Sequence, residues 1–235
     1  MAGPIHKIKG ALSLLSHGYM GVILKEVGRE LASDETCYAF RRNLSRPFDA
    51  RPATIPIAIR PFEKRDIALL GLGYRDSAQA VIDRVRRTRM IEAGIASHIY
   101  VAVTSDGSPC FIQCMISPAH NSKLSAYYKG YFPPLADDEV LLEGAFVPEH
   151  YRGAGIMRYA MSKVSEKGGA MGARWATTYV EESNLPSIRG CLACGFHPYL
   201  KKQATWRALK REVSFVPLHE AECTELEAYW KASRE

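Results

Sequence analysis

The stretch that most constrains the fold of this chain runs from Leu141 to Lys163 and changes its hydrophobic period halfway. Residues 141–147 are short, mostly apolar and followed by Pro148, which is typical of a buried strand. From Ile156 the apolar residues recur at intervals of three and four with charged residues between them, which predicts an amphipathic helix. Arg152 to Gly155 join the two. The chain therefore belongs to the α/β (α+β) class, with a glycine turn between a strand and a helix.

That turn is a predicted anion-binding site. The first N–H groups of a helix lack intrahelical acceptors and point in one direction, outward from the positive end of the helix dipole. Glycine lets a phosphate approach the backbone closely, and an arginine adds a charged donor. Neither a P-loop lysine nor a three-glycine dinucleotide fingerprint is present. We therefore expect the turn to bind the pyrophosphate of a ligand that neither of these two motifs recognises. The residues predicted to bind the cofactor that carries this pyrophosphate are Ala145, Phe146, Val147, Arg152, Gly153, Ala154, Gly155, Ile156 and Met157.

The spacing of Arg152, Gly155 and Met157 resembles the pyrophosphate loop of the GNAT (GCN5-related N-acetyltransferase) superfamily. In that loop Gln or Arg is followed by Gly three residues later and by Gly or Ala two residues after that. Met157 departs from the pattern and is expected to narrow the site. A second segment, Asn184 to Phe196, is similar to the superfamily's next motif, in which Asn, a small residue, an aromatic residue and a closing Gly-Phe recur.

The resemblance extends over about Ile57 to Leu218 and implies the GNAT fold, a mixed central sheet of about six to seven strands flanked by helices. It also implies acetyl-CoA or another acyl-CoA as co-substrate, without a metal. Asn184 and Ser187 are implied to contact that cofactor.

The proton donor is where the chain departs most from the superfamily. Many members carry a tyrosine four residues before the closing glycine, which protonates the departing thiolate, and this chain has Cys191 there. We expect Cys191 near the cofactor sulfur, although a thiol is a shorter and weaker donor than a phenol. Either water or a tyrosine of residues 127–131 then supplies the proton. No base is visible beside Cys191 to make it a nucleophile, so we predict direct transfer rather than an acyl-cysteine.

Glu143 is the predicted catalytic base. Alternation along the strand sends Glu143, Ala145 and Val147 to one face, and an apolar strand favours a raised carboxyl pKa. The alternative is a structural ion pair between Glu143 and Arg60. Other candidate bases are Glu181, Glu182, His120 and a chain of water molecules. A backbone N–H group near Ala145 to Val147 is expected to polarise the acyl carbonyl.

The sequence predicts three segments: residues 1–56, the acyltransferase domain at 57–218 and a C-terminal helix at 219–235. The first holds an amphipathic helix from Lys7 to Leu31, a short extra strand from Thr36 to Arg42 outside the superfamily core, and a proline-containing linker. The apolar stripe of that helix favours packing on the chain's own sheet or on a second subunit, as in a homodimer, over a membrane surface.

Inside the domain we predict helices at Glu63–Leu72 and Ser77–Ala93 and a hairpin turning at Asp106-Gly107. A long connection from Pro118 to Glu139 is rich in tyrosine, and long connections in compact domains are often functional. The residues predicted to bind the acceptor are Tyr127, Tyr128, Tyr131 and Glu181. The remaining strands are predicted at 57–60, 98–104, 110–117, 173–180, 197–209 and 212–217, and a short helix at 184–194.

Composition excludes several classes. Hydrophobic residues at 47% and charged residues at 24% are those of an ordinary globular protein, and no run of eighteen apolar residues predicts membrane insertion. Without a secretory signal or a disulfide pattern in its six cysteines, the chain is predicted to be cytoplasmic. The net charge of +6 suits an anionic cofactor. The arginines of residues 84–89 have no interleaved aromatic residues, so a solvated helix face is favoured over nucleic-acid binding.

The leading function is therefore an N-acetyltransferase that acts on a small-molecule amine, an amino sugar or an amino acid. A transferase of longer acyl chains is the alternative within catalysis. A noncatalytic acyl-CoA-binding regulatory module is the alternative outside it, because Cys191 replaces the usual proton donor. Turnover and its dependence on acyl-chain length distinguish the three.

Overall fold

The computed structural model describes residues 28–29, 31–66 and 87–233. The helix predicted from Lys7 to Leu31 lies almost entirely outside these residues. Of the two predicted helices that follow the first domain strand, residues 67–86 are likewise outside, and residues 87–92 are helical. Among the described residues, no helix is long and apolar enough to cross a membrane.

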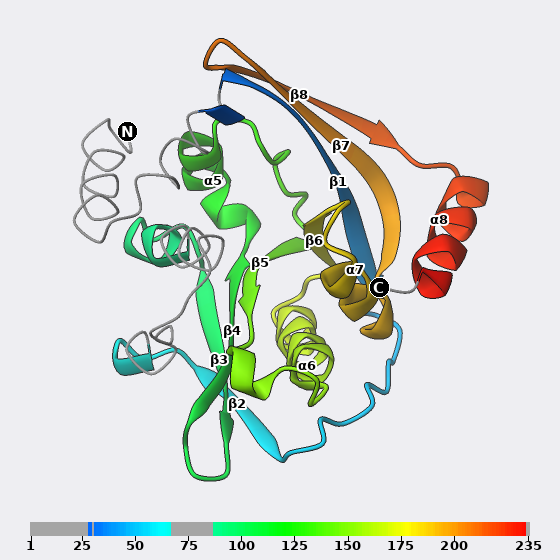
Figure 1. The fold of residues 1–235 in the computed structure, drawn as a ribbon. Coiled ribbons are helices and arrows are strands. Elements are labelled where there is room, and N and C mark those ends of the chain that lie inside the picture. Colours follow the sequence, from blue (N-terminus) through cyan, green and yellow to red (C-terminus); the bar gives the residue numbers. More distant parts are fainter. Residues whose placement is uncertain (1–27, 30, 67–86, 234–235) are drawn as a thin grey trace.

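The described chain forms one eight-stranded mixed sheet with the order β2-β3-β4-β5-β6-β1-β7-β8 (Figure 1). The β5–β6 pair is parallel and the other neighbours are antiparallel. The strands are β1 (Ala32–Asn43), β2 (Ile57–Pro61), β3 (His98–Thr104), β4 (Pro109–Ile116), β5 (Glu139–Phe146), β6 (Trp175–Glu181), β7 (His197–Arg207) and β8 (Lys210–Pro217). The helices are α5 (Asn121–Tyr128), α6 (Ile156–Ala170), α7 (Leu185–Ala193) and α8 (Glu220–Ala232), with short 3-10 turns η1 (Pro118–His120) and η2 (Glu149–Tyr151). The predicted mixed sheet flanked by helices is confirmed.

Strand β1 differs from the short strand expected outside the core. It is twelve residues long and lies between β6 and β7, pairing with Trp175–Glu181 on one side and with β7 on the other. Its centre is fully buried, with Ala39 and Phe40 at 0% exposure. A local pattern shows only that a strand is present, whereas its place in a sheet depends on pairing partners about 140 residues away. Strand β1, which precedes Ile57, is therefore part of the same sheet as the strands that follow it.

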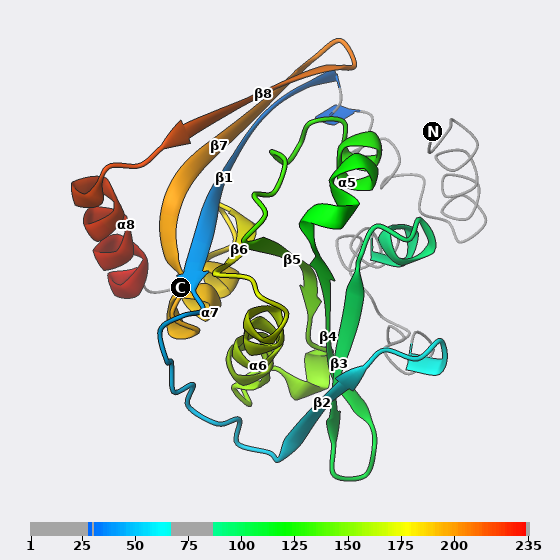
Figure 2. The ribbon, with the colours of Figure 1, turned by 180° about the vertical axis from the view of Figure 1, so that it is seen from behind.

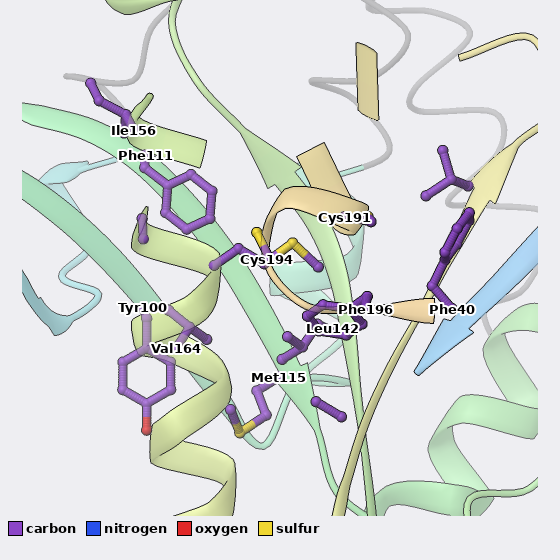
Figure 3. Packing of buried hydrophobic residues seen from close by; sticks show 14 of the residues in the cluster. Phe40, Tyr100, Phe111, Met115, Leu142, Ile156, Val164, Cys191, Cys194 and Phe196 are labelled. Carbon is purple, nitrogen blue, oxygen red and sulfur yellow. The ribbon is translucent and has the colours of Figure 1, made fainter. Parts of the chain in front are cut away.

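Hydrophobic clusters cover both faces of the sheet, as the alternation along β4 shows. Phe111 and Met115 belong to the cluster beneath α6, whereas Cys114 and Ile116 belong to the cluster with Leu124 of α5. We call these sides the α6 face and the α5 face. Figure 3 shows part of the α6-face cluster, to which α7 contributes Cys191 and, as its C-cap residue, Cys194.

Helix α8 packs against β1 and β7 (Figure 2). Its Trp230 is 1% exposed, with ring centroids 4.9 Å from Tyr38 and 5.6 Å from Phe40 of β1. The carbonyl of Trp230 accepts from Arg189 of α7 at 3.1 Å. The predicted C-terminal helix is thus packed on the sheet.

A buried hydrogen bond connects β1 to α6. The Arg42 guanidinium, 4% exposed, donates to the hydroxyl of Ser162 at 2.7 Å. We expect Ser162→Ala to lower the free energy of unfolding by about 1.5–3 kcal/mol, because a charged donor then loses a buried acceptor. Ser165→Ala is the matched control: Ser165 is equally buried but donates only to the Met161 carbonyl of its own helix, at 2.8 Å. Equal losses in urea unfolding of the two variants contradict this assignment.

Candidate functional site

Strands β5 and β6 diverge soon after they pair. Their register consists of Glu139↔Trp175, Val140↔Ala176 and Leu141↔Thr177, and beyond these residues the two strands have no paired positions within the described chain. On its other side each strand stays paired, β5 to β4 and β6 to β1. We call the region beyond Leu141 and Thr177 the β5–β6 opening. The facing backbone edges there are free to hydrogen bond to an extended ligand.

A β-bulge bends β5 where the opening begins. Ile112 pairs with Phe146 and Cys114 with Glu143, so Gly144 and Ala145 both lie opposite Gln113. Gly144 has φ +67°. The Arg87 side chain donates to the Gly144 carbonyl at 3.3 Å, and its guanidinium lies 4.2 Å from the Phe146 ring. The sequence predicted a solvated helix face for Arg87. Its side chain instead contacts the bulge of β5.

The glycine turn has the geometry of an anion cradle. Gly155, with φ +72°, precedes the first residue of α6, and Ile156 is 1% exposed and anchors that end in the core. In the part of the chain that the structure describes, no backbone carbonyl accepts from the N–H groups of residues 153–158. The carbonyl of Ala154 accepts from the Thr54 amide at 2.9 Å, which fixes the loop against the segment before β2.

Two arginines and a methionine border the cradle. Arg152 is exposed, and its Nε donates to the Val147 carbonyl at 3.4 Å. Arg158 turns its Nη2 toward Gly155, 3.2 Å from where a Cβ there would lie. Its Nε is buried without a hydrogen-bond partner among the described residues. Met157 packs toward Gly190 of α7, with Sδ 3.3 Å from where a Cβ on that glycine would lie, and so points to α7.

Glu143 lies at the opening, half-buried, on the α5 face with its pairing partner Cys114. The Gly144 amide donates to its Oε1 at 3.1 Å. The ion pair with Arg60 considered from the sequence is not formed, because Arg60 donates to both carboxyl oxygens of Asp66, at 2.7 and 2.8 Å.

The other candidate bases occupy different places. Glu181 is exposed at the end of β6, and Glu182 accepts from the Tyr38 hydroxyl at 3.2 Å. His120 follows the end of β4. The last residue of β4, Ile116, pairs with Leu141, so His120 lies toward the end of the sheet where β5 and β6 are still paired and away from the opening. Its ring is 3.4 Å from the Ser117 hydroxyl. Glu143 is thus the candidate nearest the start of the opening.

The second motif forms the predicted short helix, α7. Asn184 caps it, its side chain accepting from the Ser187 amide at 3.2 Å. Cys191 is 1% exposed inside the α6-face cluster, and burial raises the pKa of its thiol well above the ordinary value, with Cys194 adding to the effect. Cys194 donates to the Arg158 carbonyl at 3.2 Å, and both thiols are free. Cys191, which the sequence placed near the cofactor sulfur, is thus a buried side chain of the α6-face cluster.

The tyrosine-rich connection is partly helical, unlike the predicted loop, and its rings form a cluster on the α5 face. Tyr127 and Tyr128 lie on α5, 4.8 Å apart edge to face, and Phe132 contacts Tyr128, Tyr131 and also Tyr179 of β6. The Tyr128 hydroxyl donates to the Met90 sulfur at 3.2 Å. Of the predicted acceptor residues, the three tyrosines share this cluster, while Glu181 lies at the exposed end of β6.

Sequence reasoning missed Lys202, which the structure places in this cluster. The side chain is 0% exposed, and its Nζ lies 3.2 Å from the ring centroid of Tyr131. Lys202 lies between Lys201 and Gln203, and a lysine in a run of polar residues gives no sign of burial, so nothing in the local sequence identifies it. No group of His, Cys, Asp or Glu side chains suited to a metal is found among the described residues.

Comparison with known proteins shows the fold. No model of a known protein family matches the chain, and no curated protein matches it. The GCN5-related glucosamine N-acetyltransferase region of a fungal multi-domain GH3 β-N-acetylglucosaminidase has a TM-score of 0.51 and 11% identity, over 79% of this chain and 21% of that one. The chain described here therefore has the GNAT fold.

Two bacterial structures are also similar. A GCN5-related N-acetyltransferase from Sphaerobacter thermophilus has a TM-score of 0.46 and 14% identity, over 79% of this chain and 56% of that one. A GNAT-family acetyltransferase from Colwellia psychrerythraea has a TM-score of 0.45 and 10% identity, over 80% of this chain and 58% of that one. This chain spans under two thirds of either protein.

Proposed function

We propose that this protein is an acyl-CoA-dependent N-acyltransferase that moves an acetyl group directly to the amine of a small molecule, an amino sugar or an amino acid. The observation that carries the proposal is one continuous arrangement: a cradle of free N–H groups at the start of α6, followed by the unpaired edges of the β5–β6 opening. A pyrophosphate suits the cradle, and an amide-containing arm suits the two edges. The GNAT fold supports the same conclusion.

The residues present fit coenzyme A. The N–H groups of Gly153, Ala154, Gly155, Ile156 and Met157, together with Arg152 and Arg158, would hold the pyrophosphate. Ala145, Phe146 and Val147 on β5, and Asn184 and Ser187 at the start of α7, would hold the rest of the cofactor. Acyl-CoA supplies a thioester whose carbonyl carbon accepts the amine.

The acceptor binds on the α5 face in this proposal, opposite the helix that holds the cofactor. Glu143 on β5 and Tyr179 on β6 each lie two residues beyond the last β5–β6 pair, on that same face. Tyr127, Tyr128, Tyr131 and Glu181 would shape the acceptor site. Glu143 accepts a proton from the acceptor amine, and holding the two reactants in one orientation accounts for much of the rate.

A screen of amines with acetyl-CoA, octanoyl-CoA and palmitoyl-CoA, with free thiol as the readout, tests this proposal. We expect amine-dependent thiol release, fastest with acetyl-CoA. Faster release from the longer chains identifies the long-chain alternative. Tight acyl-CoA binding without release from any amine identifies the noncatalytic module. We further propose that the protein works in the cytoplasm, without nucleic acid or metal, and that a homodimer is the form to test first.

Direct transfer makes a definite prediction for Cys191. We expect Cys191→Ala to retain most of the turnover, because the thiol is buried in the core and its raised pKa keeps it protonated. The variant loses stability instead, since a small cavity opens beneath α7. Mass spectrometry after mixing with acetyl-CoA alone checks the mechanism: an acetyl group trapped on Cys191, with an inactive alanine variant, establishes a ping-pong route and overturns direct transfer.

A further inference from the structure

Among the residues that the structure describes, aromatic rings enclose the ammonium of Lys202 and no group accepts a hydrogen bond from it. Its Nζ lies 3.2 Å from the ring centroid of Tyr131, 4.9 Å from Phe132 and 5.0 Å from Tyr179. The side chain is 0% exposed, and Nζ has no hydrogen-bond partner within the described residues. Ring faces attract a cation, but they leave the three N–H donors of an ammonium without acceptors. Packing alone is better served by an apolar side chain, so a lysine here requires another reason.

The position of Lys202 supplies one. Lys202 on β7 pairs with Cys37 on β1, which in turn pairs with Glu181 on β6. Tyr179 belongs to the β6 side of the β5–β6 opening, and its ring is one wall of the cage. The ammonium therefore lies next to a ring that borders the opening, on the same face of the sheet as Glu143 of β5.

The charge of this group is poised for proton transfer. Burial lowers the pKa of Lys202 from 10.5 to about 8, while Cys37, Glu143 and Glu35 act to raise it and Arg211 to lower it. Of these charged and titratable groups, Cys37 and Glu35 are on β1, Glu143 is on β5 and Arg211 is on β8. The rings that face the ammonium come from β6, with Tyr179, and from the segment after α5, with Tyr131 and Phe132. An acid of that strength matches a departing thiolate, since a thiol has an ordinary pKa of about 8.5.

We infer that Lys202 is the proton donor to the departing thiolate, the role for which Cys191 is misplaced; the inference rests on the proposed acyl transfer. As the amine nitrogen bonds to the acyl carbon, the carbon–sulfur bond breaks and a proton passes from Nζ to sulfur. Lys202 becomes a neutral amine, and Glu143 takes the proton lost by the acceptor nitrogen. Solvent then returns a proton to Lys202 and removes one from Glu143, so the cycle balances.

The Tyr131 ring controls access to the ammonium. It is the group closest to Nζ, and its hydroxyl makes only a 3.7 Å contact with the Cys37 sulfur. Tyr131 follows Lys129 and Gly130, both in left-handed conformations with φ 50° and 75°. Rotation of this one side chain uncovers the N–H donors of Lys202 on the α5 face.

Lys202→Met tests the inference, because methionine fills similar space without the proton. We expect turnover with acetyl-CoA to fall by about a hundredfold to ten-thousandfold, with the KM for acetyl-CoA nearly unchanged. The wild-type rate should decline as pH rises through about 8, where Lys202 loses its proton, and the variant should lack this decline. Lys201→Met is the matched control, since the adjacent side chain points to the other face.

A binding experiment provides a readout that does not depend on turnover. We expect the amine NMR signal of Lys202 to shift when coenzyme A binds and to stay in place with desulfo-coenzyme A, which lacks the sulfur. Equal shifts with the two ligands overturn the contact. A wild-type protein that transfers nothing contradicts the proposed function and this inference with it, whereas an active wild type with an equally active Lys202→Met overturns the inference alone.

Folding of the variant is expected and is checked by its melting temperature. The folded-state pKa of Lys202 lies below the unfolded value, so the buried charge lowers stability at neutral pH, and that loss is recovered as pH rises from about 8 toward 10.5. Lys202→Met should therefore melt higher than the wild type at pH 7, with a difference that shrinks in alkaline buffer. A lower melting temperature at pH 7 shows that the cage needs the cation, and the kinetic comparison is then made with Lys202→Arg, which keeps a cation in the cage but does not give up its proton, so that the same fall in turnover is expected.

Discussion

Glu143→Gln is expected to lower turnover by about two to four powers of ten while leaving the affinity for coenzyme A unchanged. Glutamine keeps the size of the side chain and can still accept from the Gly144 amide, which donates to Oε1 at 3.1 Å, so the bulge should persist. What is lost is the ability to take a proton from the acceptor amine. Steady-state kinetics with a saturating amine and calorimetry with coenzyme A separate these two effects.

The pH profile of the same variant identifies the base. A catalytic carboxylate must be ionised, so the wild-type rate should fall as pH drops through its pKa, and Glu143→Gln should lose this acid limb. Glu166→Gln is the control, because Glu166 is exposed on α6 and forms only a surface ion pair with Lys163 at 3.0 Å. If Glu181→Gln or Glu182→Gln shows the large loss instead, the base is reassigned to β6 or the turn after it. A Glu143→Gln variant that fails to fold indicates a structural carboxylate.

The parts of the fold that sequence analysis predicted are those that local chemistry determines. The strand, glycine turn and helix around Gly155 follow one another along the chain, and each has its own hydrophobic period. The short helix α7 likewise carries its own signals, with Asn184 at its cap and Gly195 just past its end. The cradle could therefore be predicted in detail, down to the residues that offer N–H groups.

The parts that were missed depend on contacts between distant segments. Strand β1 was recognised, but its pairing with β6 and β7 has no local signal. Helix α5 was missed because Leu124 is its one buried residue in the described structure, so no apolar face marks it. In the sequence, Lys202 cannot be distinguished from a solvent-facing residue of a strand. It is buried in the structure because Tyr131, which is far away in the sequence, packs over it. The glycine turn with its free N–H groups was thus predictable, and the aromatic cluster around Lys202, assembled from distant segments, was not.

Gly155→Val is expected to weaken binding of coenzyme A by about tenfold to a hundredfold, the equivalent of about 1.4–3 kcal/mol. Gly155 has φ +72°, a conformation that a β-branched residue adopts only under strain. Its new Cβ would lie 3.2 Å from Nη2 of Arg158 and 3.7 Å from the Cα of Ala53, on the surface that a pyrophosphate must approach. Calorimetric titration with coenzyme A measures the loss.

Gly172→Val separates the blocked cradle from backbone strain. Gly172 also has positive φ, +95°, but a Cβ there meets nothing within 4 Å, and the residue lies just past the other end of α6. Both variants should therefore lose stability through strain, by about 1–3 kcal/mol, since α6 begins and ends on such residues. Only Gly155→Val should lose affinity, because the free N–H groups that bind the anion lie at the start of the helix and not at its end. Unchanged affinity in Gly155→Val, or an equal loss in Gly172→Val, means that coenzyme A binds elsewhere on the protein.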